Sequence, residues 1–410
     1  LGDIIGTVAG GTAAVLSVEG DVGSGKARFV REIKEITRDR EIAFYAGRGS
    51  FYQRETPFLA FREVLEQVCG FEESDSDDER RAKLQRLTEL KLDPIDIHII
   101  GELFELGFDE SNLKYLSGDQ KRIGTFEAIR KIFAGLLSDG FLVLSLENFH
   151  FLDHYSQDLA VHLARTLGDS RLLLVVTHNK GGVLPFPEET PVKRLPLPPM
   201  GESEVRQFVE ELLEVEQIPE PLHERVYSAS GGNALFVKEI VGQLRREGLI
   251  KITDGAVELG GKLDQASIPA TVEDLIASRL DSLTAGERVV LEVAATIGRS
   301  FEADLLGEVT RLAKEELNEV LARLKALKLI RRLRDDEQAG DADHTFRNEL
   351  CWEVANRGIL ASRAKEFHNR VGEVIERVKA DNLRPVFEVL SRHYQSGGLL
   401  RRAATFAEQA

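Results

Sequence analysis

The chain has 410 residues, of which 42% are hydrophobic and 30% are charged, and its formal net charge is −16. This length and composition predict a soluble globular protein of roughly two to four domains, and the acidic balance argues against a general nucleic-acid-coating role. We expect no membrane span and no secretory leader, since no apolar run approaches the ~18–20 residues that a span requires.

The first predicted element is an apolar strand at residues 13–18, which leads into a glycine-rich loop. The loop meets the pattern G-x-x-x-x-G-K at Gly20, Gly25 and Lys26, and a helical segment follows at residues 27–37. In this context of strand, loop and helix, backbone N–H groups and a lysine hold a polyphosphate. The predicted nucleotide-binding residues are Gly20, Val22, Gly23, Ser24, Gly25, Lys26, Ala27 and Arg28.

One position of this loop departs from the phosphate-binding pattern. A Ser or Thr normally follows the lysine, and its hydroxyl is a ligand of Mg²⁺. Here that residue is Ala27, which carries no oxygen on its side chain. The sequence therefore predicts the architecture of a nucleotide-binding protein from which one catalytic part is missing.

Three further apolar runs, at residues 41–47, 141–146 and 172–177, alternate with helical segments. Near-continuous apolar strands separated by helices predict a parallel sheet that is covered on both faces. We therefore expect a three-layer α/β P-loop NTPase fold. An acidic segment at 71–80 is expected to be a mobile connector, and a proline-rich segment at 195–199 predicts a linker.

Beyond the linker the sequence is almost entirely helical, except for two strands expected within residues 329–346. Three helices followed by a hairpin are typical of a winged helix. The predicted domains are a P-loop NTPase-like domain (1–195, with a helical insertion at about 70–118), a small helical lid (196–265), a winged-helix domain (266–346) and an all-α C-terminal segment that opens a TPR-like repeat array (347–410).

A second candidate site for catalysis lies where the strand at 141–146 ends. A P-loop ATPase needs an acidic residue at this position to hold Mg²⁺, often followed by a base that orients water. Glu147 could hold the metal, although a solvated glutamate at a strand end would have the same sequence. Asn148 cannot accept a proton, so general-base catalysis, typically worth about 10²–10⁴-fold, is lost at this position.

Five motifs follow one another in the chain, at residues 20–27 (GDVGSGKA), 146–153 (LENFHFLD), 177–179 (THN), 230–236 (SGGNALF) and 346–350 (FRNEL). In order and spacing they resemble the motifs of the STAND class of P-loop ATPases, the signal-transduction ATPases of large LuxR-type activators and of multidomain kinases and cyclases. Members of that class typically read G-E-x-G-x-G-K-[ST], L-[DE]-D-x-H-W-x-D, T-x-R, S-G-G-N-P-L-F and F-R-H-x-L. The resemblance covers nearly the whole chain.

The resemblance implies a role for each position at which this chain departs from the class. Position 27 would hold Mg²⁺, 148 would be the catalytic acid, and 179 would be a phosphate-sensing arginine. Position 234 would be a proline beside the adenine, and 348 a winged-helix histidine that touches the ADP phosphate. The chain has Ala27, Asn148, Asn179, Ala234 and Asn348 there, while Gly25, Leu235, Phe236, Phe346 and Arg347, interpreted as packing residues, are retained.

These departures indicate that nucleotide chemistry has degenerated while the fold is kept. Lys26, Glu147 and Asp153 persist, however, so ATP or ADP could still bind, with Mg²⁺ at Glu147, without being turned over. Our leading hypothesis is a pseudo-ATPase that acts as a regulatory scaffold, binding other proteins through its C-terminal repeats and its ATPase domain. The alternative is a working ATP/ADP-dependent switch that self-associates on activation.

A third hypothesis is a winged-helix regulator that binds DNA through its most basic stretch, Lys325, Lys328, Arg331, Arg332 and Arg334. The same stretch could equally be a face that pairs with the acidic residues 335–337, and DNA contact is not our expectation. No metal is expected beyond Mg²⁺ at Glu147. The two cysteines, Cys69 and Cys351, form no metal or disulfide pattern, so a reduced, cytoplasmic compartment is predicted.

Overall fold

The computed structural model describes residues 2–49, 56–72, 74–108, 113, 116–138, 140–253, 255–260, 271–333, 342–380 and 383–409. The chain divides into two compact units, residues 1–199 and residues 200–410. Each unit is described by itself below.

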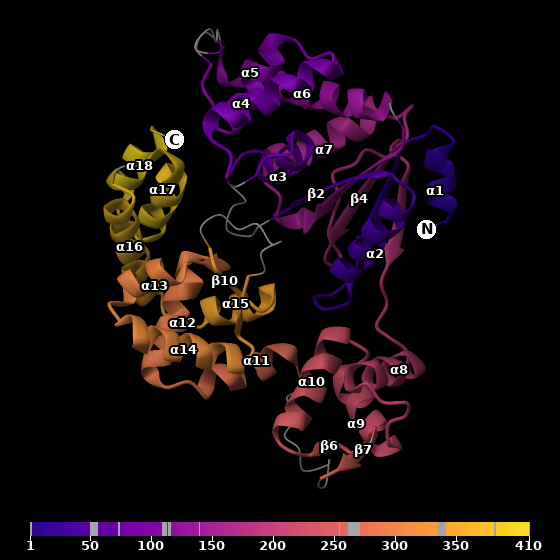
Figure 1. Cartoon of the computed structure of the whole chain (residues 1–410), viewed down its shortest axis with the longest axis vertical. Helices are drawn as coiled ribbons and strands as arrows, with labels where there is room; N and C mark the ends of the chain where they lie inside the picture. The colour runs from indigo at the N-terminus through magenta and orange to yellow at the C-terminus, as the bar shows by residue number, and fades with distance from the viewer. Residues whose placement is uncertain are drawn as a thin grey trace. The chain divides into compact units, whose positions relative to one another are not determined.

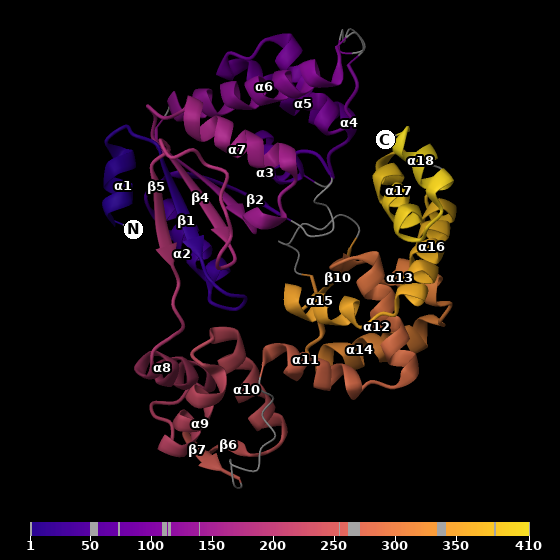
Figure 2. The same ribbon diagram turned by 180° about the vertical axis from the view of Figure 1, so that it is seen from behind.

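The N-terminal unit is an α/β domain in which strands and helices alternate (Figures 1 and 2). Its strands are β1 (Ala14–Glu19), β2 (Ala43–Arg48), β3 (Leu142–Glu147), β4 (Leu172–His178) and β5 (Val192–Pro196). Its α-helices are α1 (Gly2–Ala9), α2 (Lys26–Asp39), α3 (Leu59–Cys69), α4 (Asp77–Gln85), α5 (Pro94–Leu103), α6 (Gly118–Ser138) and α7 (His154–Thr166).

The five strands form one parallel sheet in the order β2-β3-β4-β1-β5. Alternate residues of β1, β3 and β4 point to opposite faces. On one face they pack against α1 and α2, and on the other they share one core cluster with α3, α6 and α7, to which α5 is joined through α6. Both faces are thus buried, which explains the near-continuous apolar runs and confirms the predicted three-layer fold.

The fifth strand was not predicted from the sequence. β5 overlaps the segment expected to be a linker, and it pairs only with β1. As an edge strand it has exposed charged residues, Lys193 and Arg194, and it ends at Pro196, which is tolerated at the edge of a sheet. These features remove the apolar pattern by which the other four strands are recognised.

The opposite edge of the sheet, β2, is covered by side chains from α3. The Gln67 amide donates a hydrogen bond from Nε2 to the Ala46 carbonyl at 2.6 Å and accepts one at Oε1 from the Ala46 N–H at 3.1 Å. Two residues along the strand, the Arg48 N–H donates to Glu63 Oε2 at 2.8 Å. The N–H and carbonyl of Ala46 and the N–H of Arg48 are therefore satisfied without another strand.

The acidic segment at 71–80 is more ordered than expected, because a helix begins inside it. Ser76 caps α4, accepting a hydrogen bond from the Glu79 N–H, while the Glu79 carboxylate accepts from the Ser76 N–H at 2.8 Å. This reciprocal capping box satisfies two N–H groups at the helix start. Capping and the first-turn acidic residues, which favour a helix N-terminus, explain the helix.

The C-terminal unit is mainly helical and contains two small sheets (Figure 1). Its helices are α8 (Glu202–Leu213), α9 (Glu220–Ser230), α10 (Ala234–Arg246), α11 (Val272–Asp281), α12 (Ala285–Ile297), α13 (Ala303–Thr310), α14 (Lys314–Ala326), α15 (Glu349–Arg357), α16 (Ala361–Val378), α17 (Phe387–Ser396) and α18 (Leu400–Ala407). Its strands are β6 (Ile250–Thr253), β7 (Ala256–Leu259), β8 (Ser300–Phe301), β9 (Ile330–Arg332) and β10 (His344–Phe346). β6 and β7 pair as a hairpin, and the other three form a sheet in the order β8-β10-β9.

The last three helices pack closely around a buried aromatic residue. Tyr394 of α17 is fully buried, stacks on Phe406 of α18 and donates a hydrogen bond to Glu376 of α16 at 2.5 Å. A Cβ on Gly372 would lie 2.9 Å from the Tyr394 ring, so α16 approaches the ring only because it has a glycine there.

In the described part of the chain, no helix combines the length and apolar character needed to cross a membrane.

Candidate nucleotide-binding site

The predicted phosphate-binding loop connects the end of β1 to the start of α2. Gly23 and Gly25 have φ of 83° and 99°, in the left-handed region that favours glycine. Gly25 is the N-cap residue of α2, and no side chain caps the helix. The first N–H groups of a helix have no intrahelical partner, so this loop and helix start form a backbone concavity suited to an anion.

Ser24 gives this concavity an unpaired hydroxyl. Its Oγ is buried and has no hydrogen-bond partner among the described residues. A Cβ on Gly20 would lie only 2.3 Å from that oxygen, so glycine at position 20 leaves the Ser24 hydroxyl in its place. A buried hydroxyl without a partner costs free energy, and a phosphate oxygen in the loop would supply the missing acceptor. Ala27, Arg28 and Val22 lie on the exposed side of the same segment.

The Lys26 ammonium group is folded back onto the loop. Nζ donates to the carbonyls of Gly20 at 2.6 Å and Asp21 at 3.0 Å, and to Oδ1 of Asn179 at 3.2 Å. These partners are neutral, so a phosphate group would be a stronger acceptor for the same proton donors. The lysine is thus placed at the loop, in contact with the end of β4.

Asn179 links the loop to a third segment. Its Nδ2 lies 3.1 Å from Nε2 of His150, in the short helix after β3. Since the amide oxygen faces Lys26, the amide nitrogen is the atom that donates to Nε2 of His150. His150 was not predicted to be a site residue. The motif that this segment resembles normally has a histidine at this position, so its presence gave no sign of a special role.

Glu147 is at the end of β3 and is largely buried, with 9% of its surface exposed. Its Oε1 accepts a hydrogen bond from Nε of Arg48 at 3.2 Å, and the two residues are in register on neighbouring strands. Glu63 accepts a hydrogen bond from the Arg48 N–H, and burial raises the pKa of its carboxyl group to about 7. The carboxylate that could hold a metal ion is therefore engaged by an arginine that sequence reasoning did not single out.

Asn148 is fixed by its backbone. Its φ is 53°, a left-handed conformation that asparagine tolerates better than most residues. Its N–H donates to Thr177 Oγ1 at 3.0 Å, and its carbonyl accepts from the Phe151 N–H at 2.7 Å. The asparagine thus suits the turn after β3, but its carboxamide cannot take a proton from water.

Asp153 is the last residue of the segment that resembles a STAND motif, and in the structure its carboxylate has a structural role. It is buried and caps α7, accepting hydrogen bonds from the Ser156 N–H at 2.9 Å and the Ser156 hydroxyl at 2.5 Å. It also accepts from the Phe58 N–H at 3.0 Å, which fixes the start of α3. This one carboxylate therefore joins two helices on the same side of the sheet.

Replacing Asp153 with Ala is expected to destabilise the N-terminal unit by about 2 kcal/mol, because it removes a helix cap and leaves the buried Phe58 N–H unpaired. Amide hydrogen exchange over α7 and the start of α3 should accelerate. Asp158→Ala, on the same helix but partly exposed, is the control. Equal exchange in both variants would contradict a structural role for Asp153.

Ala234 and Asn348 both lie in the C-terminal unit, at helix starts. Ala234 is the first residue of α10, directly after the capping residue Asn233. Asn348 caps α15, and its Oδ1 accepts from the Cys351 N–H at 2.8 Å. The asparagine side chain is therefore used locally, in a role for which asparagine is among the best residues.

A basic cluster surrounds one buried carboxylate near Asn348. Glu239 of α10 and Arg279 of α11 form a buried ion pair. Lys328 Nζ and Arg246 Nη1 both lie within 3.5 Å of the point that a Cβ on Gly242 would occupy. Burial lowers the pKa of Lys328, and the nearby arginines, including Arg347, lower it further. Arg347, predicted to be a packing residue, is instead exposed.

Among the described residues, no group of three or more His, Cys, Asp or Glu side chains is placed to hold a metal ion. For a phosphate group, in contrast, the P-loop offers backbone N–H groups, the hydroxyl of Ser24 and the ammonium group of Lys26. For Mg²⁺, the predicted positions offer only Glu147, which is paired with Arg48, and Ala27, which has no ligand atom. The residues present fit a phosphate group better than they fit the metal.

Comparison with known protein families gives matches in both units. Residues 1–176 match the family model of an AAA ATPase domain, and residues 201–258 match a domain family of unknown function. The chain is 24% identical over 413 residues to the uncharacterized protein R02095 of Rhizobium meliloti, covering 98% of this chain and 39% of that protein. It is 22% identical over 420 residues to adenylate cyclase type 10 of Oryctolagus cuniculus, covering 88% of this chain and 26% of the cyclase. The chain thus spans well under half the length of these relatives.

Among solved structures, the whole chain aligns with a STAND protein that has a tetratricopeptide repeat sensor, from Pyrococcus horikoshii. The TM-score is 0.53 at 10% sequence identity, and the alignment covers 49% of that protein. At this identity the likeness concerns the fold. Together with the AAA ATPase domain match over residues 1–176 and the parallel sheet, it shows that the chain shares the fold of a STAND-class P-loop ATPase.

Proposed function

We propose that this chain is a regulatory module of a signalling protein, which binds ATP or ADP but hydrolyses little or none of it. The observation that carries the proposal is the set of residues at the ends of β3 and β4, of which Asn179 contacts Lys26 of the P-loop. Asn148 and Asn179 are neutral amides, and Glu147 is paired with Arg48. None of the three supplies a free general base.

Retention of nucleotide is supported by the loop itself. Gly23, Gly25 and the uncapped start of α2 provide N–H donors, and Ser24 Oγ is a buried hydroxyl without a partner among the described residues. Lys26 can exchange its neutral acceptors for phosphate oxygens. When bound, Mg²⁺ would neutralise phosphate charge, but Ala27 removes one of its usual ligands, so nucleotide binding should depend only weakly on the metal.

We further propose that the C-terminal unit acts by binding other proteins. Helices α12, α13 and α14 with the sheet β8-β10-β9 support a winged helix, and the packing of the consecutive helices α17 and α18 supports the first hairpin of a TPR-like array. Similarity to part of adenylate cyclase type 10 of Oryctolagus cuniculus supports a role in regulation. Self-association of the module is part of this proposal.

A working ATP-dependent switch is the second candidate, and the retained pair of Lys26 and Glu147 favours it. Such a switch needs a catalytic acid, which this chain lacks at position 148. DNA binding remains a prediction without a supporting observation. Arg331 and Arg332 lie on β9, while the acidic residues 335–337 lie outside the described part of the chain.

Thermal unfolding with and without millimolar ATP or ADP tests nucleotide binding. A nucleotide at about 100 times its Kd adds roughly 2.7 kcal/mol to the free energy of unfolding. Lys26→Ala should abolish this gain. Ser24→Ala should weaken it while leaving the unliganded protein at least as stable, because the lost hydroxyl has no partner. No shift with either nucleotide would overturn the nucleotide-binding part of the proposal.

Phosphate release separates the two candidate functions. We expect no hydrolysis above background in the natural chain, and a gain in Mg²⁺-dependent hydrolysis in the double variant Ala27→Ser, Asn148→Asp, which restores a metal ligand and an acid. Aspartate tolerates the left-handed backbone at position 148. Turnover by the natural chain that Lys26→Ala abolishes would favour the switch.

A further inference from the structure

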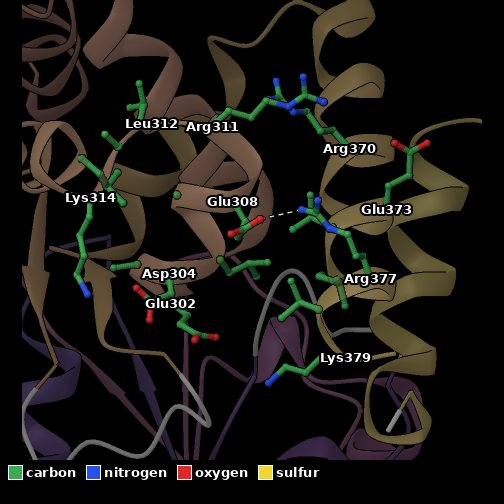
Figure 3. A pocket seen from close by; sticks show the side chains of 18 residues that line it. Glu302, Asp304, Glu308, Arg311, Leu312, Lys314, Arg370, Glu373, Arg377 and Lys379 are labelled. Atoms are coloured by element: carbon green, nitrogen blue, oxygen red, sulfur yellow. Dashed lines mark hydrogen bonds and ion pairs between the residues drawn. The ribbon is translucent and has the colours of Figure 1, made fainter. Parts of the chain in front are cut away.

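A groove of about 1200 Å³ lies in the C-terminal unit between α13 and α16. Figure 3 shows α13 and the turn after it on one side and the C-terminal half of α16 on the other. Ligand sites usually measure roughly 300–1,000 Å³, so the groove has room for an organic molecule. None of its residues belongs to the candidate nucleotide-binding site.

The floor of the groove is apolar. Leu317 of α14 and Val374 and Ile375 of α16 line it and are themselves buried. Val378, at the end of α16, lines the same groove with 51% of its surface exposed. An apolar side chain that remains exposed beside a buried apolar floor would gain free energy if a ligand covered it.

The rim of the groove is charged, and the sign of its net charge is opposite to that of the whole chain. Five basic and four acidic side chains line it, whereas the whole chain has a net charge of −16. One pair crosses the groove, with Arg377 Nη2 lying 2.8 Å from Glu308 Oε2. This pair neutralises itself, so the excess of positive charge comes from the other basic residues.

Two of these, Arg311 and Arg370, extend toward each other from opposite sides of the groove (Figure 3). Within the described residues, neither guanidinium group has a hydrogen bond or an ion pair. Arg311 ends α13 with φ of 59°, a left-handed conformation that costs a non-glycine residue free energy. Two converging guanidinium groups repel each other, and an oxyanion between them would remove the repulsion while filling both donor forks.

We propose that this groove binds an amphiphilic organic anion. Its carboxylate or phosphate head lies between Arg311 and Arg370, and its apolar body covers the floor at Val374 and Val378. The paired arginines select a planar or tetrahedral oxyanion, and the apolar floor selects against a bare inorganic ion. The groove is thus an effector site, separate from the P-loop, within the unit proposed to bind other proteins.

Calorimetric titration of the full chain with four probes tests the proposal. Octanoate and octyl phosphate, used below micelle-forming concentrations, carry the required head and body, and the tighter of the two identifies the head group. Inorganic phosphate should bind at least about tenfold more weakly, and octyltrimethylammonium should not bind. Equal binding of the cationic probe, or no binding of either octyl anion at millimolar concentration, would overturn the proposal.

Variants assign the binding to the groove. Arg311→Ala and Arg370→Ala should each weaken the octyl anion about tenfold, while Arg401→Ala, an exposed arginine on α18, should not. Val378→Ser should weaken the octyl anion but leave inorganic phosphate unchanged. Equal losses in Arg401→Ala would show non-specific binding and reject the site. Thermal unfolding of Arg370→Ala with and without nucleotide keeps the two proposals distinct. If the nucleotide still stabilises this variant, the P-loop binds nucleotide whether or not the groove binds an anion.

Discussion

Replacing Glu239 with Gln is expected to destabilise the C-terminal unit by about 3–5 kcal/mol, more than any other single change considered for this chain. Glu239 is the carboxylate that compensates Arg279, and the two form a buried ion pair between α10 and α11. Lys328 and Arg246 lie close by. Burial lowers the pKa of both, neighbouring cations lower it too, and Glu239 opposes the shift in each case. Without the carboxylate, Arg279 becomes an uncompensated buried charge among other cations.

The measurement is urea unfolding followed by fluorescence. The chain has one tryptophan, Trp352, which is buried on α15 and donates a hydrogen bond to the Ala295 carbonyl at 3.0 Å. Its emission therefore reports on the C-terminal unit. Glu247→Gln, an exposed change at the end of the same helix, should cost less than about 0.5 kcal/mol. A loss for Glu239→Gln no larger than the control would mean that the ion pair contributes little.

Acid is expected to weaken the same unit through a pair of buried histidines. Nδ1 of His368 on α16 and Nδ1 of His393 on α17 lie 3.0 Å apart. Burial, and then the charge of Arg392, lower the pKa of His368 to about 4, and burial also lowers the pKa of His393 well below its usual value. Both rings are therefore neutral in the folded protein over most of the physiological range.

The sign follows from the unfolded chain, in which a histidine has a pKa of about 6.5. As pH falls below that value, the unfolded state takes up protons that the folded state does not, so the free energy of unfolding decreases. The stabilisation is complete above about pH 6.5 and is lost as pH falls toward 4, and for His368 alone it amounts to about 3 kcal/mol.

Urea unfolding of Trp352 at pH 7 and pH 5 measures this effect. In His368→Gln the difference between the two pH values should shrink by about 2 kcal/mol, because one of the depressed groups is gone. His154→Gln removes an exposed histidine of α7 and should keep the natural difference. If His368→Gln also keeps it, then the titration of carboxylates, and not of this pair, governs acid unfolding.

Much of the N-terminal unit could be predicted from the sequence, because its chemistry and its periodicity are local. The P-loop is a contiguous motif, and strands buried on both faces leave apolar runs that need no partner to be recognised. β5 lacks that run because one of its edges faces solvent. A helical insertion was predicted at about 70–118, but its start at Asp77, inside the segment expected to be mobile, was missed because acidic residues favour both a mobile segment and the first turn of a capped helix.

The partners of the site residues could not be predicted, because they are distant in sequence. Lys26 and Asn179 are 153 positions apart, and Arg48 and Glu147 are 99 apart. The roles of single residues were ambiguous in the sequence as well. Asp153 fits a catalytic carboxylate and a helix cap equally well in sequence, and only its three hydrogen bonds distinguish the two. Asn348 was interpreted from the sequence as lost chemistry, and its additional use as a helix cap could be recognised only in the structure.

The side chains of α3 along β2 also determine how the sheet meets other molecules. A bare edge strand is a template on which another β-strand can pair, and this leads to aggregation or domain swapping. Gln67 and Glu63 already occupy the outward backbone groups of Ala46 and Arg48, while Lys193 and Arg194 place charge on the opposite edge strand, β5. On β2, the backbone groups that a new strand would need are thus already hydrogen-bonded at these two residues. On β5, a new strand would have to pack beside exposed charged side chains. Both features disfavour copies of this chain pairing strand to strand at either edge.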